Sequence, residues 1–227
     1  MESVHYMANV TTAGNILFGT MSILLSVVGR HIAAAWIIFF SIVFDIADGK
    51  IARMGTKGFT QFGKQFDSLA DLVSFVVAPA VLIFTLYTPE FFLWRVLVCL
   101  LAVFCGAFRL ARFNVEAEEK ITLFFNGLPT PAFAGMLTSL VLVCHRYNIV
   151  VEPRVIELIV GFLAMMMVSH IKYPTYKGVS LLQWHYGLSF IIILLLLFVI
   201  PELVVFVLFG IYVVCIPVKI NLAKGLK

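Results

Sequence analysis

Charged side chains are scarce in this sequence. Asp, Glu, Lys and Arg make up 12% of its 227 residues, whereas 62% of the residues are hydrophobic. Soluble domains carry about 25% charged residues, so this shortage excludes an ordinary water-soluble fold. The mean hydropathy of +1.07 agrees with that conclusion. Because an apolar helix of about 20 residues crosses a bilayer, the sequence predicts an all-α integral membrane protein.

The sequence also lacks long polar stretches and a recognisable leader. Its longest polar stretch covers about residues 112–127, so we expect one membrane domain over residues 1–227. Residues 1–11 contain no Lys or Arg to form the basic region of a signal peptide. The first apolar run is therefore expected to stay in the mature protein.

Two further classes of site lack the residues that they need. The four cysteines lie inside apolar runs without CxxC spacing, which argues against a zinc site or a disulfide framework. The net charge of +4 is not accompanied by a basic stretch with an aromatic platform, so no nucleic-acid partner is expected. We attribute the positive charge to membrane orientation and to contact with anionic lipid headgroups.

Apolar runs long enough to cross a bilayer recur along the chain. About eight are predicted, at approximately residues 12–29, 32–52, 65–87, 91–111, 131–147, 154–170, 180–199 and 201–218. With eight spans, the C-terminus and the connections 50–64, 109–120 and 172–177 share one side, which holds 12 of the 16 Lys and Arg residues. The positive-inside rule makes that side cytoplasmic. We therefore expect a multi-pass protein of the cell membrane with both termini in the cytoplasm.

Aspartate is rare, and its positions are the strongest signal in the sequence. The four aspartates are Asp45, Asp48, Asp67 and Asp71. The first two are three residues apart near the predicted cytoplasmic end of the second span, and the last two are four apart at the start of the third. Each pair therefore occupies one helix face.

Four carboxylates at a helical hairpin need compensation. Each acidic side chain within a span costs about 2.5–3.5 kcal/mol, so these residues are expected to face the protein interior. Lys50 and Arg53 neutralise only part of the charge, which makes a purely structural acid–base network a weaker explanation. Carboxylate oxygens suit Mg²⁺ or Mn²⁺, and a pair of such ions polarises a phosphoryl group. The pattern predicts two divalent cations and a cytoplasm-facing active site.

The residues around the aspartates form the pattern Asp45-x2-Asp48-Gly49-x2-Ala52-Arg53-x9-Gly63-x3-Asp67-x3-Asp71. Gly49 and Gly63 lie beside or before an aspartate, where a missing side chain lets a phosphate or nucleotide approach the backbone. This pattern resembles the CDP-alcohol phosphotransferase family, whose motif is D-x2-D-G-x2-A-R-x8/9-G-x3-D-x3-D. Every fixed position of that motif is present.

The resemblance implies a chemistry that spacing alone does not show. In it, a CDP-linked lipid binds with its pyrophosphate on the metals, an alcohol attacks the lipid-side phosphorus and CMP leaves. Asp45, Asp48 and Asp67 are implied to bind metal or nucleotide phosphate. Asp71 is implied to bind metal and to act as general base toward the alcohol. Arg53, Gly49 and Gly63 are implied to line the CDP site, and a homodimer is expected.

A softer resemblance extends over nearly the whole chain, to the phosphatidylserine synthase branch of that family and its archaeal members. It rests on Asn9-x2-Thr12-x2-Asn15, on Asp67-Ser68-x2-Asp71, on the segment 105–114 with Arg109, Arg112 and Asn114, on Gly127-Leu128-Pro129-Thr130-Pro131, and on Ile171-Lys172-Tyr173-Pro174. The resemblance implies L-serine as the acceptor and CDP-diacylglycerol or CDP-archaeol as the donor.

Residues outside the aspartate motif have weaker candidate roles. Arg109 and Arg112 lie on one helix face and are suited to gripping a carboxylate or lipid phosphate, although basic residues are common at cytoplasmic helix ends. Asn114 and Lys172 are further candidates for substrate contact. Asn9 and Thr12 are candidates for the CDP site, with helix capping and packing as the alternative.

Two other functions remain open from the sequence. One is a sister transferase that uses glycerol 3-phosphate or inositol phosphate, for which a denser basic pocket is expected. The other is a divalent-cation carrier, because carboxylates within a membrane also mark ion pathways. The position of the acids at helix ends and the lack of a convincing inverted repeat disfavour the carrier.

Overall fold

The computed structural model describes residues 2–54, 61–86, 92–119, 124–174 and 199–215, with side chains for all of these except 2–9, 46–54, 117–119, 124–125, 174 and 215. The elements occur in the order α1 (Glu2–Val27), α2 (His31–Met54), α3 (Gln61–Leu72), the π-helical turn η1 (Val73–Val77), α4 (Ala78–Leu86), α5 (Phe92–Glu119), β1 (Phe124–Asn126), α6 (Thr130–Arg146), α7 (Pro153–Val168), β2 (Lys172–Pro174), α9 (Pro201–Gly210) and the π-helical turn η3 (Ile211–Cys215).

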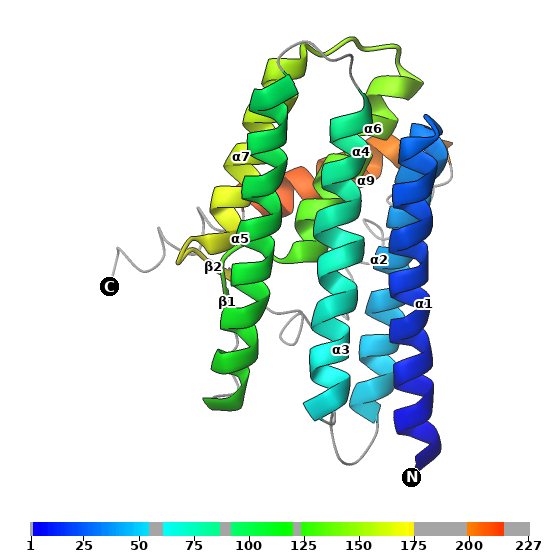
Figure 1. Cartoon of the computed structure of the whole chain (residues 1–227), viewed down its shortest axis with the longest axis vertical. Coiled ribbons are helices and arrows are strands. Elements are labelled where there is room, and N and C mark those ends of the chain that lie inside the picture. The colour runs from blue at the N-terminus through cyan, green and yellow to red at the C-terminus, as the bar shows by residue number, and fades with distance from the viewer. Residues whose placement is uncertain (1, 55–60, 87–91, 120–123, 175–198, 216–227) are drawn as a thin grey trace, which may run out of the picture.

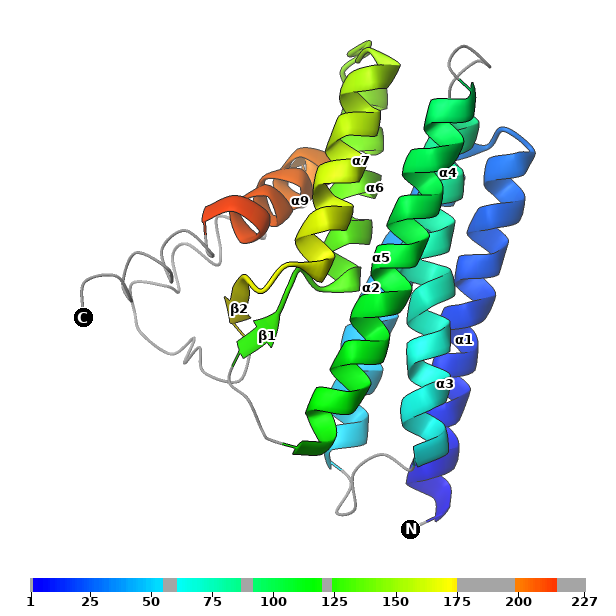
Figure 2. The ribbon, with the colours of Figure 1, turned by 60° about the vertical axis from the view of Figure 1, so that its left-hand side comes forward.

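The long helices run up and down the molecule in turn (Figure 1). The N-terminus, the end of α2, the start of α3 and the end of α5 gather at one end of the bundle (Figures 1 and 2). The connections α1–α2 and α6–α7, the end of α4 and the start of α5 lie at the other. The side of the membrane on which each connection lies stays a prediction from the charge pattern.

One long helix is interrupted by a π-helical turn just after the aspartates. Within η1, the Ala78 N–H donates to the Val73 carbonyl, a bond that spans five residues instead of four. Pro79 follows at once, and its ring has no N–H and would clash with the carbonyl four residues earlier in a regular α-helix. The wider turn accommodates the proline and lets α3, η1 and α4 continue as one rod over Gln61–Leu86.

The core lies between α2, η1, α4, α6 and α7, and its largest fully buried side chains include Ile38, Phe75, Phe133, Leu137 and Met167. The outer faces are apolar as well: Leu17, Leu93 and Phe104 are 68%, 70% and 67% exposed. Exposed apolar side chains in such numbers require a solvent other than water, which is what a bilayer provides.

The predicted helical class is confirmed, and the molecule is a membrane-associated helical protein. Within the described part of the chain, three helices are long and apolar enough to cross a membrane, over Val10–Val27, Gln61–Leu86 and Phe92–Glu116. His31–Asp45 and Pro201–Val214 are shorter apolar helices. The predicted run 180–199 lies almost wholly outside the described residues. The helix α9, within the last predicted run, is steeply inclined to its neighbours (Figure 2). The number of about eight spans stays a prediction.

The sequence did not predict the two strands. β1 and β2 pair antiparallel, with Phe125 opposite Tyr173 and Asn126 opposite Lys172. They were missed because three residues are too few to show an alternating pattern. The chain turns sharply after β1: Gly127 has φ +80°, and α6 begins at Thr130 directly after Pro129. A side chain at Gly127 would start 2.1 Å from the Met167 carbonyl oxygen.

Close approach of α1 to η1 depends on Gly19. A β-carbon there would lie 2.4 Å from Ser74 Oγ and 2.7 Å from Ser74 Cα, whereas a β-carbon at Gly14 on the same helix meets nothing within 4 Å. We predict that Gly19→Ala lowers the free energy of unfolding by about 1–3 kcal/mol through overpacking. Gly14→Ala is the matched control and should be neutral or slightly stabilising. Thermal unfolding in detergent measures both, and equal melting temperatures for the two variants would contradict this packing.

Candidate metal and phosphate site

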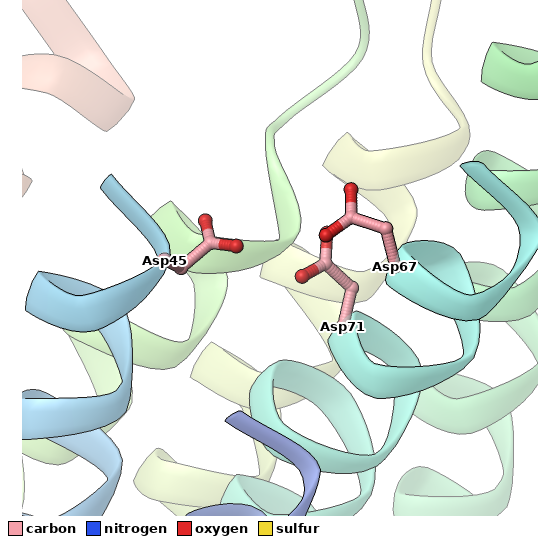
Figure 3. Close-up of side chains that lie close together, drawn as sticks. All are labelled: Asp45, Asp67 and Asp71. Atoms are coloured by element: carbon pink, nitrogen blue, oxygen red, sulfur yellow. The ribbon is translucent and has the colours of Figure 1, made fainter. Parts of the chain in front are cut away.

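Three of the four aspartates come together between α2 and α3. Asp45 projects from α2 toward Asp67 and Asp71 on α3, and carboxylate oxygens of the three residues lie within 4.8 Å of one another (Figure 3). All three side chains are partly buried. Asp67 and Asp71 share a face because they are four residues apart on one helix. The sequence prediction that the two pairs meet across the hairpin therefore holds for these three.

This arrangement is electrostatically unfavourable without a cation. Two unit charges separated by the 4.8 Å limit of the cluster repel by about 3–4 kcal/mol at an effective dielectric constant of about 20. Oxygens on opposite sides of one Mg²⁺ are about 4.2 Å apart, so small rotations of the carboxylates suffice to bind an ion. The donor set, all oxygen and anionic, fits Mg²⁺ or Mn²⁺.

Several predicted residues of the motif lie where only the backbone is described. Asp48, Gly49 and Arg53 belong to α2, which continues as a helix to Met54, and Asn9 belongs to α1, but their side chains are outside the described residues. Gly63 is buried on α3, one turn before Asp67, and Thr12 is buried on α1 with 4% of its surface exposed.

Arg109 lies next to the acidic cluster. It comes from α5, is 6% exposed, and its Nε has no hydrogen-bond partner among the described residues. The ionisable groups close enough to act on its charge are Asp71, Tyr212 and Arg112. A buried guanidinium with a donor to spare is suited to an anionic ligand.

Arg112 is placed differently, although it is only one turn away. Its Nη1 donates to the Val168 carbonyl at 2.9 Å and its Nη2 to the Asn126 carbonyl at 2.9 Å, with a longer contact to the Ser169 carbonyl at 3.3 Å. A looser ion pair joins its Nε to Glu116 at 3.9 Å. The side chain thus ties α5 to the end of α7 and to β1.

Asn114 connects α5 to α3 instead of standing free. Its Nδ2 donates to Ser68 Oγ at 2.8 Å, and its main-chain carbonyl accepts a hydrogen bond from the Lys64 ammonium. Lys172 lies exposed on β2. The structure thus brings Arg109 to the aspartates, uses the described donors of Arg112 and Asn114 in contacts between elements, and leaves Lys172 on the surface.

Comparisons with known proteins identify the family. The family model of CDP-alcohol phosphatidyltransferase matches residues 5–171, which include all four aspartates. The chain belongs to the CDP-alcohol phosphatidyltransferase family. The resemblance inferred from the aspartate motif is therefore confirmed.

The relatives of this CDP-alcohol phosphatidyltransferase chain cover most of its length. It is 35% identical over 219 residues to a CDP-diacylglycerol–serine O-phosphatidyltransferase of Helicobacter pylori (strain J99), covering 94% of this chain and 90% of the relative. A protein of that name from Bacillus subtilis is 35% identical, covering 77% of this chain and 93% of the relative. An archaetidylserine synthase of Methanothermobacter thermautotrophicus is 36% identical, covering 73% of this chain and 68% of the relative.

The family motif did not point to Tyr212, which lies beyond residue 171 where the family match ends. Tyr212 packs against Tyr173 with ring centroids 5.5 Å apart, and the fully buried Tyr173 hydroxyl donates to the Val213 carbonyl at 3.1 Å. Burial raises the pKa of Tyr173 to about 12, so this hydroxyl stays a donor at physiological pH. These contacts fix η3 beside β2, where Tyr212 comes within range of Arg109. Only the three-dimensional fold reveals this connection.

Two arginine substitutions distinguish a structural role from a substrate role at position 112. Arg112→Ala leaves the Val168 and Asn126 carbonyls without this donor, so we predict a loss of about 1–3 kcal/mol in the free energy of unfolding. Arg146→Ala removes an exposed arginine at the end of α6 and should change stability little. Chemical denaturation in detergent measures both. An Arg112→Ala protein with wild-type stability but no activity would instead support the substrate contact predicted from the sequence.

Proposed function

We propose that this protein transfers a phosphatidyl or archaetidyl group from a CDP-linked lipid to L-serine and releases CMP. The observation that carries the proposal is the meeting of Asp45, Asp67 and Asp71 between two helices of a membrane-associated chain of this family. Relatives that align with most of this chain are named for transfer to serine, and this supports serine as the acceptor. CDP-diacylglycerol and CDP-archaeol are the candidate donors, in keeping with the bacterial and archaeal relatives.

In this proposal Asp45, Asp67 and Asp71, together with Asp48, hold two Mg²⁺ or Mn²⁺ ions. The ions would supply charge neutralisation for the pyrophosphate of the donor and polarise its phosphoryl oxygens. Gly49 and Gly63 leave room for the nucleotide and its phosphates to approach the helix backbones. Arg53, Asn9 and Thr12 complete the proposed CDP site.

The proposed reaction is an in-line displacement at the lipid-side phosphorus. The serine hydroxyl oxygen forms a bond to that phosphorus while the bond to the bridging oxygen of the pyrophosphate breaks, and CMP leaves with that oxygen. The hydroxyl proton passes to the Asp71 carboxylate. A general base has to reach the attacking oxygen at about 2.6–3.2 Å. Asp71 is the carboxylate of the cluster whose charge acts on Arg109, the proposed partner of the serine carboxylate.

The basic groups around the cluster favour a carboxylate acceptor over a phosphate acceptor. Among the described side chains, the donors of Arg112 go to main-chain carbonyls and the Lys64 ammonium donates to the Asn114 carbonyl. Arg109, whose charge interacts with that of Asp71, has no hydrogen-bond partner for its Nε among the described residues. One guanidinium suits the single negative charge of a serine carboxylate, whereas glycerol 3-phosphate and inositol phosphate carry more charge. We place this site on the cytoplasmic side of the membrane, in agreement with the distribution of Lys and Arg.

Release of CMP tests the acceptor directly. Purified protein in detergent is supplied with CDP-diacylglycerol or CDP-archaeol, Mg²⁺ or Mn²⁺, and one candidate alcohol at a time. We expect CMP release with L-serine and little release with glycerol 3-phosphate or inositol phosphate. Release that depends on one of the phosphorylated alcohols but not on serine would refute the serine proposal. Metal uptake by proteoliposomes without any CMP release would favour a cation carrier instead.

Conversion of individual aspartates to asparagine separates proton transfer from metal binding. Asp71→Asn removes the proposed base and should lower the rate of CMP release by at least about 10²-fold, with no recovery at high metal concentration. Asp67→Asn is the matched variant one turn earlier, and excess Mg²⁺ should restore part of its rate. If excess metal rescued both variants equally, Asp71 would be a metal ligand without a role as base. The exposed Glu152→Gln serves as a control for loss of a carboxylate elsewhere.

A further inference from the structure

A buried polar contact joins three segments about one helical turn from the acidic cluster. Asn15 of α1 is 1% exposed, and Ser41 of α2 and Ser74 of η1 are fully buried. Ser41 Oγ donates to Asn15 Oδ1, and Ser74 Oγ donates to the Asn15 main-chain carbonyl at 2.8 Å. We call these three residues the Asn15 cluster. A single residue of α1 is thus bonded to both helices that carry the aspartates.

The spacing relates this cluster to the carboxylates. Ser41 precedes Asp45 by four residues in α2, and Ser74 follows Asp71 by three residues in the rod formed by α3 and η1. Residues three or four apart share a helix face, so each serine lies one turn from its aspartate. The two helices run in opposite directions, and both offsets therefore point toward the same end of the bundle (Figure 1).

Close backbone packing leaves α1 little room to move along η1 at this contact. Gly19 lies one turn beyond Asn15, and a β-carbon there would lie 2.4 Å from Ser74 Oγ. The helix α1 and the π-helical turn therefore meet at backbone contact distance beside the hydrogen bonds. Interhelical hydrogen bonds within membranes contribute little stability on average, so their main effect here is on geometry.

Packing alone does not explain why an asparagine side chain occupies position 15. Its Nδ2 is buried and has no hydrogen-bond partner among the described residues. A buried amide with unused donors costs free energy, and an apolar side chain of similar size avoids that cost. The part of the amide that makes a contact is its oxygen, Oδ1. It accepts a hydrogen bond from Ser41 and so fixes α2 relative to α1.

We infer that Asn15 is a positioning residue that sets, through Ser41 and Ser74, the distance across which Asp45 and Asp71 share a divalent cation. The inference rests on the metal-binding part of the proposed function. Metal ligands have to be held within about 0.5 Å of their working positions, and residues that orient ligands typically change metal affinity by about 10- to 100-fold when they are mutated.

Mn²⁺ binding without substrates tests this inference on the full chain in detergent or nanodiscs. Electron paramagnetic resonance measures free Mn²⁺ during a titration of wild type, Asn15→Leu, Ser41→Ala and Ser41→Thr. We expect Asn15→Leu to raise the Mn²⁺ dissociation constant by about 10- to 100-fold and Ser41→Ala to raise it less. Ser41→Thr keeps the hydroxyl donor and should restore affinity.

Ser22→Ala is the matched control. Ser22 is fully buried on α1 and donates to the Ala34 carbonyl of α2 at 3.0 Å, so this variant also loses a buried hydrogen bond between the same two helices. It lies two turns beyond Asn15, away from the acids. We expect a melting temperature lowered as in Ser41→Ala, with unchanged Mn²⁺ affinity.

The outcomes separate this inference from the proposed function. Wild-type Mn²⁺ affinity in folded Asn15→Leu or Ser41→Ala, or an equal loss in Ser22→Ala, would overturn the positioning role. If Asn15→Leu failed to fold, Ser41→Ala with its Thr counterpart would still decide the question. Absence of Mn²⁺ binding in the wild type would overturn the metal assignment and the inference together. Failure of serine in the CMP assay would leave the Mn²⁺ comparison intact.

Discussion

The structure depends on holding carboxylates close together at the ends of two membrane helices. Asp45 and Asp71 sit on different helices and would drive them apart, because each pair of charges at this spacing repels by about 3–4 kcal/mol. A bound cation removes this repulsion only if the ligands are already near the right distance. The packing of α1, α2 and α3 therefore has to oppose the repulsion before the ion arrives.

The helices are held from two sides. On one side α1 approaches so closely that Gly19 touches the backbone of Ser74, and the Asn15 cluster joins α1 to both acidic helices. On the other side α5 is bonded to α3 through Asn114, Ser68 and the Lys64 ammonium. Because these contacts lie within about one or two turns of the aspartates, they act on the spacing of the carboxylates more directly than the apolar core does.

The sequence predicted those features that depend on neighbouring residues. Hydropathy located most of the described helices to within a few residues, but α1 begins ten residues before the predicted run and α5 ends eight residues after it. The aspartate spacing predicted that Asp45, Asp67 and Asp71 meet, and their carboxylates lie together. It did not reveal the strands, which are too short to show a pattern, or the π-helical turn, which is a response to Pro79 within a helix. It also treated Arg109 and Arg112 as equivalent, because helix periodicity gives the shared face and not the partner that each side chain meets.

The acidic cluster and the surroundings of Arg109 therefore differ in how the sequence encodes them. The acidic half comes from one helical hairpin, and its spacing is visible in about 27 consecutive residues, 45–71. The half around Arg109 is assembled from α5, β2 and η3, whose contacts join residues as far apart as Tyr173 and Val213. Chemistry common to a whole family fits the first kind of encoding, since it survives changes elsewhere in the chain. If the proposed function holds, choice of acceptor fits the second, because substitutions near Arg109 on β2 or η3 leave the sequence of the acidic hairpin unchanged.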